Sequence, residues 1–355
     1  MKSVLADLTV IEVASVLAGP AVGMYFAEKG AKVIKVENKI TNGDVTRSWK
    51  LPVEDSNSSI SAYFSSVNWH KEHLFLDFND QNELKELQNL IKNADILITN
   101  FKAGDAQKFG LDLHSVKELN DHIILAELSG FGAKDERVAY DLVLQAETGF
   151  MSMNGEPNGK VVKMPVAFID LFAAHQLKEG ILEALLTQKL QSGAYHVQVS
   201  LYDAAIASLA NQASNYLMTG SIPKPLGSKH PNIAPYGELF ETKDGFLITF
   251  AIGSDKQFES LCKELDIEVK AIYSNNKDRV THREEIASLI SLKVKNFNAD
   301  DLLNKLIQLK VPVAKVKDLK SVFEDTKAKD LILEETVDNT KTKRVKTVVY
   351  SINRI

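Results

Sequence analysis

Residues 8–37 read LTVIEVASVLAGPAVGMYFAEKGAKVIKVE and decide the fold of the N-terminal part of the chain. Residues 8–13 are dense in β-branched and apolar side chains, as is typical of a strand buried on both faces. Ser15–Pro20 breaks this pattern and predicts a loop that leads into a helix. Gly30 has the position of a left-handed helix cap, and residues 31–37 are again strand-like. The stretch therefore predicts a strand–helix–strand unit of an α/β protein.

The turn after the first strand lacks the glycines of a dinucleotide site. Such a site needs G-x-G-x-x-G at this turn, so that the backbone can approach a pyrophosphate closely. Here the turn carries Val16, Leu17 and Ala18 instead. The sequence therefore disfavours NAD binding, although the expected fold is the one that usually carries NAD.

The composition is that of an ordinary globular enzyme. A chain of 355 residues is long enough for two domains, since single cores stop growing at about 250–300 residues. A formal net charge of -5 argues against a nucleic-acid or anionic-membrane partner. The single cysteine, Cys262, excludes an internal disulfide framework and fits a reducing compartment. With too short an N-terminal apolar run for a signal peptide, these features predict a cytoplasmic protein.

Strand-like and helical segments alternate as far as about residue 220. The expected strands cover residues 8–14, 31–37, 73–78, 95–100 and 122–128. Alternation of this kind implies right-handed crossovers and a Rossmann-like parallel sheet. A long helix over about 171–190, a strand over 196–201 and a helix over 203–218 follow.

A second, smaller α+β domain is expected after the Pro-, Gly- and Ser-rich segment Thr219–Pro235. Residues 237–251 predict a hairpin that turns at Asp244–Gly245. Amphipathic helices are expected at about 255–265, 282–297 and 299–309. The tail, residues 343–352, is strand-like and is expected to return to the first domain. We therefore expect a large domain over 1–220 with a C-terminal return over 325–355, and a small domain over 225–324.

Several motifs in fixed order give the chain a family resemblance. They include ASVLAGP, VIKVE with GDVTRSW, NWHKEHLFLDF, DILITNFKAG, LSGFG, YDLVLQAETG, IDLFAAHQLKEGILEAL, VQVSLYDAAIASLANQ and HPNIAPY. From Leu5 to about Val348 the chain resembles the family III CoA-transferases, the CaiB/BaiF family of formyl-CoA transferase and carnitine CoA-transferase. The resemblance implies an interlocked homodimer that moves CoA from an acyl-CoA thioester to a free carboxylic acid. It implies no prosthetic group, with coenzyme A or acyl-CoA acting as substrate.

The predicted chemistry centres on Asp170, which lies just before a long amphipathic helix. An N-cap role alone explains an aspartate at this position. The resemblance implies instead that Asp170 attacks the thioester, giving an aspartyl mixed anhydride and then an aspartyl-CoA thioester. A carboxylate at a helix N-terminus is expected to stay ionised, with a pKa of ~3.9 or below.

The resemblance also implies a set of CoA-binding residues. These are Val16, Ala18, Lys71, Leu74, Asn100, Phe101, Lys108 and Tyr140. The two lysines offer point charges for phosphates, and Phe101 offers an apolar face. The alternatives are solvated surface lysines and a core phenylalanine. Backbone N–H groups of Gly130–Gly132 or Gly149 are candidates for an oxyanion site.

Leu17, Trp49 and His230 are the candidate substrate residues, by resemblance for the first two and by the HPNIAPY motif for His230. Leu17 differs from the polar residue at the matching place in formyl-CoA transferase, which disfavours an oxalate or formate substrate. For His230, ordering of its loop is the alternative. The His, Cys, Asp and Glu residues lack metal-ligand spacing, so a metal is not expected.

Two other functions remain open on the sequence alone. An α-methylacyl-CoA racemase of the same superfamily pairs a histidine with an aspartate as acid and base. Here Tyr140 precedes Asp141 where those enzymes have that histidine, which argues against racemisation. The second alternative is a noncatalytic acyl-CoA-binding protein, against which the intact Asp170 counts.

Overall fold

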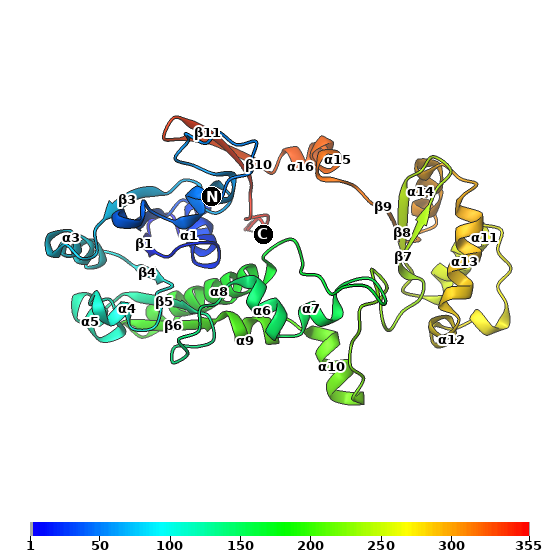
Figure 1. The fold of residues 1–355 in the computed structure, drawn as a ribbon, viewed down its shortest axis with the longest axis horizontal. Coiled ribbons are helices and arrows are strands. Elements are labelled where there is room, and N and C mark those ends of the chain that lie inside the picture. Colours follow the sequence, from blue (N-terminus) through cyan, green and yellow to red (C-terminus); the bar gives the residue numbers. More distant parts are fainter. Residues whose placement is uncertain (1–2, 355) are drawn as a thin grey trace. The chain divides into compact units, whose positions relative to one another are not determined.

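The computed structural model describes residues 3–354, and the chain folds into two compact units (Figure 1). The first comprises residues 3–150, 163–221 and 330–354, and the second comprises residues 151–162 and 222–329. The sequence assigns residues 151–162 to the large domain and starts the C-terminal return at 325. In the structure residues 151–162 lie in the second unit, where the amide of Gly227 donates to the carbonyl of Gly155, and the C-terminal segment of the first unit starts at 330.

The first unit is built on a six-stranded sheet whose neighbouring strands all pair in parallel. Its strands are β1 (Thr9–Val13), β2 (Lys32–Asn38), β3 (Glu72–Leu76), β4 (Ile96–Thr99), β5 (Ile124–Ser129) and β6 (Tyr195–Ser200). The strand order is β3-β2-β1-β4-β5-β6, which is the order of doubly wound dinucleotide-binding sheets. The predicted Rossmann-like sheet is therefore confirmed. The direction of winding reverses between β1 and β4, where such folds bind ligands.

Helices cover both faces of this sheet, as right-handed crossovers between parallel strands require. One face carries α1 (Ala18–Glu28) and α8 (Phe168–Leu190), and the other carries α3 (Gln81–Ile91) and α5 (Leu113–Leu119). Successive residues of a strand point to opposite faces, so Ile96 and Ile98 join one core and Leu97 the other. Burial on both faces explains the apolar runs of the central strands.

Shorter elements complete the first unit. They are α2 (Ala62–Ser65), α4 (Asp105–Lys108), α6 (Asp141–Glu147), α9 (Leu201–Ala207), α10 (Ala210–Thr219), the 3-10 turns η1 (Lys39–Thr41) and η2 (Val45–Ser48), and the hairpin of β10 (Ile332–Val337) and β11 (Thr340–Val345). Helix α7 (Phe150–Met153) crosses the boundary between the units. The single helix expected over 203–218 is two helices, separated by a turn at Ser208 and Leu209, because Ala210 takes a left-handed φ of 47° that interrupts the helix.

The C-terminal return packs on α1 in a conformation that is only partly a strand. Strand β11 ends at Val345, so the strand expected over 343–352 is wrong beyond that residue. The Glu28 carboxylate accepts hydrogen bonds from the Arg344 guanidinium and from the Val348 amide, the latter at 2.7 Å. Val348 is buried in the core formed by α1 and α8.

The second unit is the smaller α+β domain. A three-stranded antiparallel sheet contains β7 (Tyr236–Glu241), β8 (Leu247–Ala251) and β9 (Val313–Lys315) in this order. Its helices are α11 (Asp255–Glu264), α12 (Asn276–Thr281), α13 (Arg283–Val294), α14 (Ala299–Gln308), α15 (Leu319–Glu324) and α16 (Thr326–Lys329), with a 3-10 turn η3 (Ala271–Tyr273). Cys262 is buried in the core of this unit.

Candidate active site

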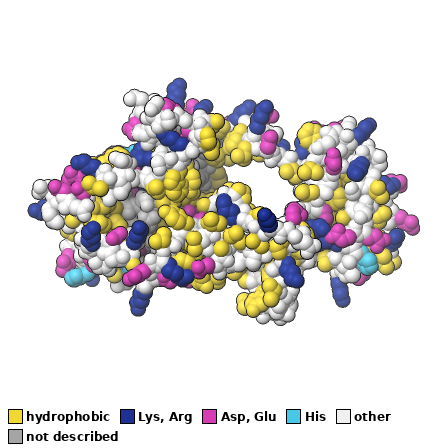
Figure 2. Space-filling view, viewed as in Figure 1, with side chains coloured by type: hydrophobic (Ala, Val, Ile, Leu, Met, Phe, Trp, Pro, Cys, Tyr) yellow, Lys and Arg dark blue, Asp and Glu magenta, His cyan; other side chains and the backbone are white. Residues whose placement is uncertain are grey.

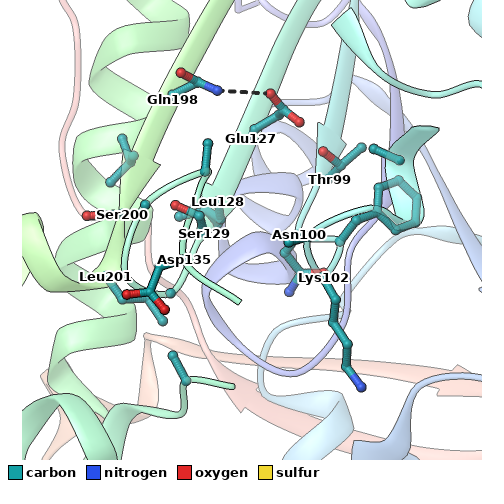
Figure 3. A pocket seen from close by; sticks show the side chains of 18 of the residues that line it. Thr99, Asn100, Lys102, Glu127, Leu128, Ser129, Asp135, Gln198, Ser200 and Leu201 are labelled. Atoms are coloured by element: carbon teal, nitrogen blue, oxygen red, sulfur yellow. Dashed lines mark hydrogen bonds between the residues drawn. The ribbon is translucent and has the colours of Figure 1, made fainter. Parts of the chain in front are cut away.

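A pocket of about 630 Å³ opens at the carboxyl ends of the parallel strands of the first unit (Figure 3). Its walls come from the loop after β1, the loop after β4, the ends of β5 and β6, the segment 130–140 and the first turn of α8. The loops after β1 and β4 flank the point where the sheet reverses its winding. The pocket therefore occupies the place where open α/β sheets bind their ligands.

Asp170 lines this pocket from the first turn of α8 and is 7% exposed. It is not the N-cap of the helix, because α8 already begins at Phe168 and its N-cap is Ala167. The Asp141 carboxylate takes over the capping role. It accepts hydrogen bonds from the amides of Ile169, at 2.8 Å, and Asp170, at 3.4 Å.

Burial and, to a smaller degree, the nearby Asp141 carboxylate raise the pKa of the Asp170 carboxyl from its ordinary value to about 7. The expected pKa of ~3.9 or below is therefore wrong. The physical reason is that the pocket wall removes water from the carboxylate, while the second carboxylate adds repulsion. Asp170 thus exists in both protonation states near neutral pH.

Gln145 of α6 fixes the Asp141 carboxylate. Its side-chain amide donates to Asp141, and its side-chain oxygen accepts from the amide of Met164 at 2.8 Å. Gln145 is 1% exposed, and its bond to Asp141 is buried. The residues that hold the start of α8 were not found from the sequence, although Asp141 directly follows the motif residue Tyr140.

Most of the residues predicted to bind CoA or substrate meet at the pocket. Its lining includes Val16, Leu17, Ala18, Asn100, Phe101 and Tyr140, together with Gly130 and Gly132 of the candidate oxyanion segment. Trp49 lies beside them, because its ring centroid is 6.5 Å from that of Tyr140. Asn100 also joins two walls of the pocket, since its side-chain oxygen accepts from the amide of Ser15 at 3.1 Å and its side-chain nitrogen donates to the Ser15 carbonyl at 2.9 Å.

Three predicted residues have other surroundings. The Lys71 ammonium is buried and donates to the Glu12 carboxylate at 2.7 Å, so the structure gives it a role inside the fold. Leu74 packs against the core beneath α3 and α5. Lys108 is exposed at the end of α4, with its ammonium 5.1 Å from the centroid of the Phe109 ring.

His230 belongs to the second unit. Its ring packs on Tyr236, with centroids 5.0 Å apart, and its Nδ1 accepts from the amide of Asn232 at 3.1 Å. The Arg283 guanidinium donates to the carbonyls of His230 and Ile233 at 2.5 Å each. These bonds order the loop, which is the alternative that the sequence left open for this residue.

The pocket also holds polar residues that the sequence did not indicate. Lys102 and Arg137 bring positive charge to its lining, and the side chain of Lys102 extends from the loop after β4 (Figure 3). Glu127 of β5 accepts from His196 and from Gln198 of β6, the latter at 3.3 Å. Lys102 lies inside the quoted NFKAG motif, whereas pairing across β5 and β6 becomes visible only once the strand register is known.

Residues 3–354 contain neither a metal cluster nor a membrane-spanning helix. Within that range, His, Cys, Asp and Glu side chains do not gather into a group of three or more able to hold a metal ion. Over the same described residues, every helix is too short or too polar to cross a membrane.

The sheet order and the pocket at its switch point define an α/β protein of the Rossmann-like class. The sequence identifies the family within that class. The model of CoA-transferase family III matches residues 5–353, so the chain belongs to this family and is a CoA-transferase. The resemblance drawn from the motifs and the predicted enzyme class are both confirmed.

Characterised relatives cover nearly the whole chain. A succinate–glutarate CoA-transferase of Agrobacterium fabrum is 38% identical over 333 residues, which are 91% of this chain and 82% of that protein. A human succinyl-CoA:glutarate CoA-transferase is 31% identical over 90% of this chain and 73% of its own length. The crystal structure of a CaiB/BaiF family protein from Brucella suis has a TM-score of 0.85 and 33% identity, covering 99% of this chain and 93% of that one.

Proposed function

We propose that this protein transfers CoA from an acyl-CoA thioester to a free carboxylic acid, with Asp170 as the covalent nucleophile. The observation that carries the proposal is the buried Asp170 carboxylate in the lining of the pocket. A carboxylate that has lost much of its water is less shielded by solvent and attacks an acyl carbon more readily. The alternative of a noncatalytic binding protein gives no reason for burying a carboxylate there.

The transfer runs as four exchanges at one carboxyl group. The Asp170 carboxylate attacks the thioester carbon, the C–S bond breaks, and CoA leaves as a thiolate from a mixed anhydride. The thiolate attacks the aspartyl carbon and releases the first acid as its carboxylate, which leaves an aspartyl-CoA thioester. The second acid then attacks this thioester and expels CoA, and CoA attacks the new anhydride at its substrate carbon. The new acyl-CoA departs and Asp170 regains its carboxylate.

The pocket supplies what this sequence of steps requires. Val16, Ala18 and Phe101 offer apolar surface to the pantetheine or adenine, and Lys102 offers positive charge to phosphates. The amides of Gly130 and Gly132 remain the candidates for stabilising an oxyanion. Because only ionised Asp170 attacks, we expect the rate to rise with pH as Asp170 loses its proton near pH 7.

We propose that the acids are dicarboxylates of about four or five carbons. Succinate and glutarate stand in the names of the Agrobacterium and human relatives. Leu17 in the pocket lining disfavours oxalate, because it offers no polar group to a second carboxylate placed directly beside the first. We also propose that the protein works in the cytoplasm as an interlocked homodimer.

The test combines trapping with a substrate matrix. Incubation with succinyl-CoA and hydroxylamine should convert Asp170 to its hydroxamate, detectable by peptide mass spectrometry. The Asp170→Ala variant should lose CoA transfer by several orders of magnitude. Glu136→Gln is a matched control, because Glu136 is an exposed carboxylate of the same pocket lining and should be neither trapped nor needed.

Mass detection of CoA exchange over a set of acyl-CoA donors and acids then tests the substrate class. Transfer to succinate or glutarate supports it, and transfer only to monocarboxylic acids contradicts it. A fully active Asp170→Ala enzyme would overturn the covalent mechanism.

A further inference from the structure

Four charged side chains form a buried network beneath the loop that follows β1. Glu12, Lys35 and Lys71 have fully buried side chains, and the side chain of Asp44 is 1% exposed. The two carboxylates and two ammonium groups balance in charge. None of the four is in the lining of the pocket, among the residues that the structure describes. The network is therefore placed to act on the loop rather than on a ligand.

Lys35 links β1, β2 and the loop. It lies opposite Glu12 in the parallel register of β1 and β2, and its ammonium donates to Glu12 at 3.0 Å. The same ammonium donates to the carbonyl of Ala14 at 2.6 Å, where β1 passes into the loop. It also pairs with the Asp44 carboxylate at 3.1 Å.

Asp44 connects the buried network to Val16, at the centre of the loop. Its carboxylate accepts from the amide of Val16, at 3.1 Å for Oδ2, and from the amide and hydroxyl of Thr46 at 3.0 and 2.8 Å. Val16 has a φ of 72°, in the left-handed region that a β-branched residue avoids. Such strain costs on the order of 1–3 kcal/mol and persists only where the surroundings enforce it. The Asp44 carboxylate is the side chain that bonds the strained residue's amide.

Lys71 anchors the far end of the loop, where α1 begins. Its ammonium donates to the carbonyl of Pro20 at 2.8 Å, to Asn68 at 2.9 Å and to Glu12. Burial lowers its pKa to about 8, so it is mostly charged at neutral pH. Gly23 of α1 leaves the space that this arrangement needs, because a Cβ there would lie 1.8 Å from the Glu12 carboxylate.

The loop backbone is thus held at Ala14 by Lys35 and at Val16 by Asp44, and the first turn of α1, which follows it, is held at Pro20 by Lys71. Replacing a buried ion pair with apolar side chains of similar size often leaves a protein equally stable. Stability alone is therefore a weak reason for four buried charges here. Three of the four, Lys35, Asp44 and Lys71, bond backbone atoms within residues 14–20. Ser15–Ala18, in the middle of this segment, all line the pocket.

We propose that Asp44, held by Lys35, is a positioning residue for CoA binding: it fixes Val16 in its left-handed conformation and so keeps the Ser15–Ala18 wall of the pocket in the shape that receives the ligand. The inference rests on the proposal that this pocket binds CoA. Asp44 itself stays outside the pocket. Preorganisation of this kind lowers the entropy lost on binding and therefore acts on affinity.

The test measures the affinity for free CoA by isothermal titration calorimetry, in the full-length protein. Asp44→Ala should weaken binding by tenfold or more, and Asp44→Asn, which keeps an acceptor oxygen, should lose less. Glu28→Gln is the matched control. It disrupts another buried ion pair of the first unit, between Glu28 and Arg344, and should leave the affinity unchanged even if it lowers the melting temperature.

A double-mutant cycle separates positioning from a general loss of stability. Glycine adopts a φ of 72° without strain, so the fold-loss in affinity caused by Asp44→Ala should be smaller in a Val16→Gly background. Non-additivity of this kind is the signature of residues that act on one another. A variant that merely loosened the fold would lose the same factor in both backgrounds.

The outcomes are distinct. Failure of the wild-type protein to bind CoA contradicts the proposed function itself. Tight binding by the wild type with unchanged affinity in Asp44→Ala, or an equal loss in Glu28→Gln, overturns the positioning role alone. If Asp44→Ala does not fold, the same comparison is made with Asp44→Leu, which keeps a similar side-chain volume and removes both acceptor oxygens, and unchanged affinity in that variant overturns the positioning role.

Discussion

At Asp170, burial that favours the proposed chemistry also creates a dependence of stability on pH. Its pKa is about 7 in the folded protein and ~3.9 in an unfolded chain. The group's contribution to stability is therefore complete below about pH 4 and is lost as the pH rises through 7. Asp170→Asn cannot ionise, so the wild type alone loses this stability as the pH rises. The melting temperature of the variant minus that of the wild type should therefore increase from pH 5 to pH 8. The corresponding free energy is on the order of a few kcal/mol.

Thermal melts of wild type, Asp170→Asn and Glu136→Gln at pH 5 and pH 8 check this expectation. The exposed Glu136 serves as the control, and its variant should keep a constant difference from the wild type. A constant difference for Asp170→Asn as well would mean that Asp170 is ionised throughout this range.

Tyr140 is the residue that argues against racemisation, because it stands where the racemases have their histidine. Racemisation needs a second acid or base opposite Asp170, and the phenol of a tyrosine is a much poorer general base than the imidazole of a histidine. In the structure Tyr140 lines the pocket and its ring lies near that of Trp49. A 2-methylacyl-CoA incubated with the protein in D₂O should therefore gain no α-deuterium by mass spectrometry. Rapid deuteration without an acceptor acid would favour a racemase.

At the scale of elements, the sequence predicted the parts that local pattern controls. The apolar strands, their alternation with helices and the loop after β1 all follow from periodicity and turn residues. The start of α8 does not, because its cap comes from Asp141, which is 29 positions before Asp170. Local pattern placed Asp170 at the helix start but missed the residue that caps it.

The same limit explains why the sequence did not reveal the buried ion pair of Lys71. Its sequence neighbours, NWHKEHL, suggest a surface lysine or a phosphate ligand, whereas its ammonium lies beneath the first loop. A buried lysine becomes visible only when β1, β2 and the segment before β3 are side by side, since its partner Glu12 is 59 positions away. Contacts of this kind depend on strand order, which the motif does not specify.

At the scale of the whole molecule, α10 bears on assembly. All ten of its residues lie in the described part of the chain, and none is buried there. Leu217 and Met218 are 79% and 84% exposed, and hydrophobic side chains gather on this helix (Figure 2). A helix that presents large apolar side chains to water marks a surface that another protein covers. For the proposed homodimer, a second copy of the chain is the partner that supplies this cover.

We therefore predict a dimer that persists on dilution and that depends on α10. Sedimentation velocity of the wild type should give the mass of two chains at micromolar concentration. Leu217→Glu with Met218→Glu should weaken or abolish the dimer, because burying two carboxylates in an apolar contact is costly. Asn211→Glu is the control, since it adds a charge to a polar, exposed position of the same helix and should leave the mass unchanged. A wild-type monomer at micromolar concentration would contradict the interlocked assembly, and a dimer that survives both glutamates would show that α10 lies outside the interface.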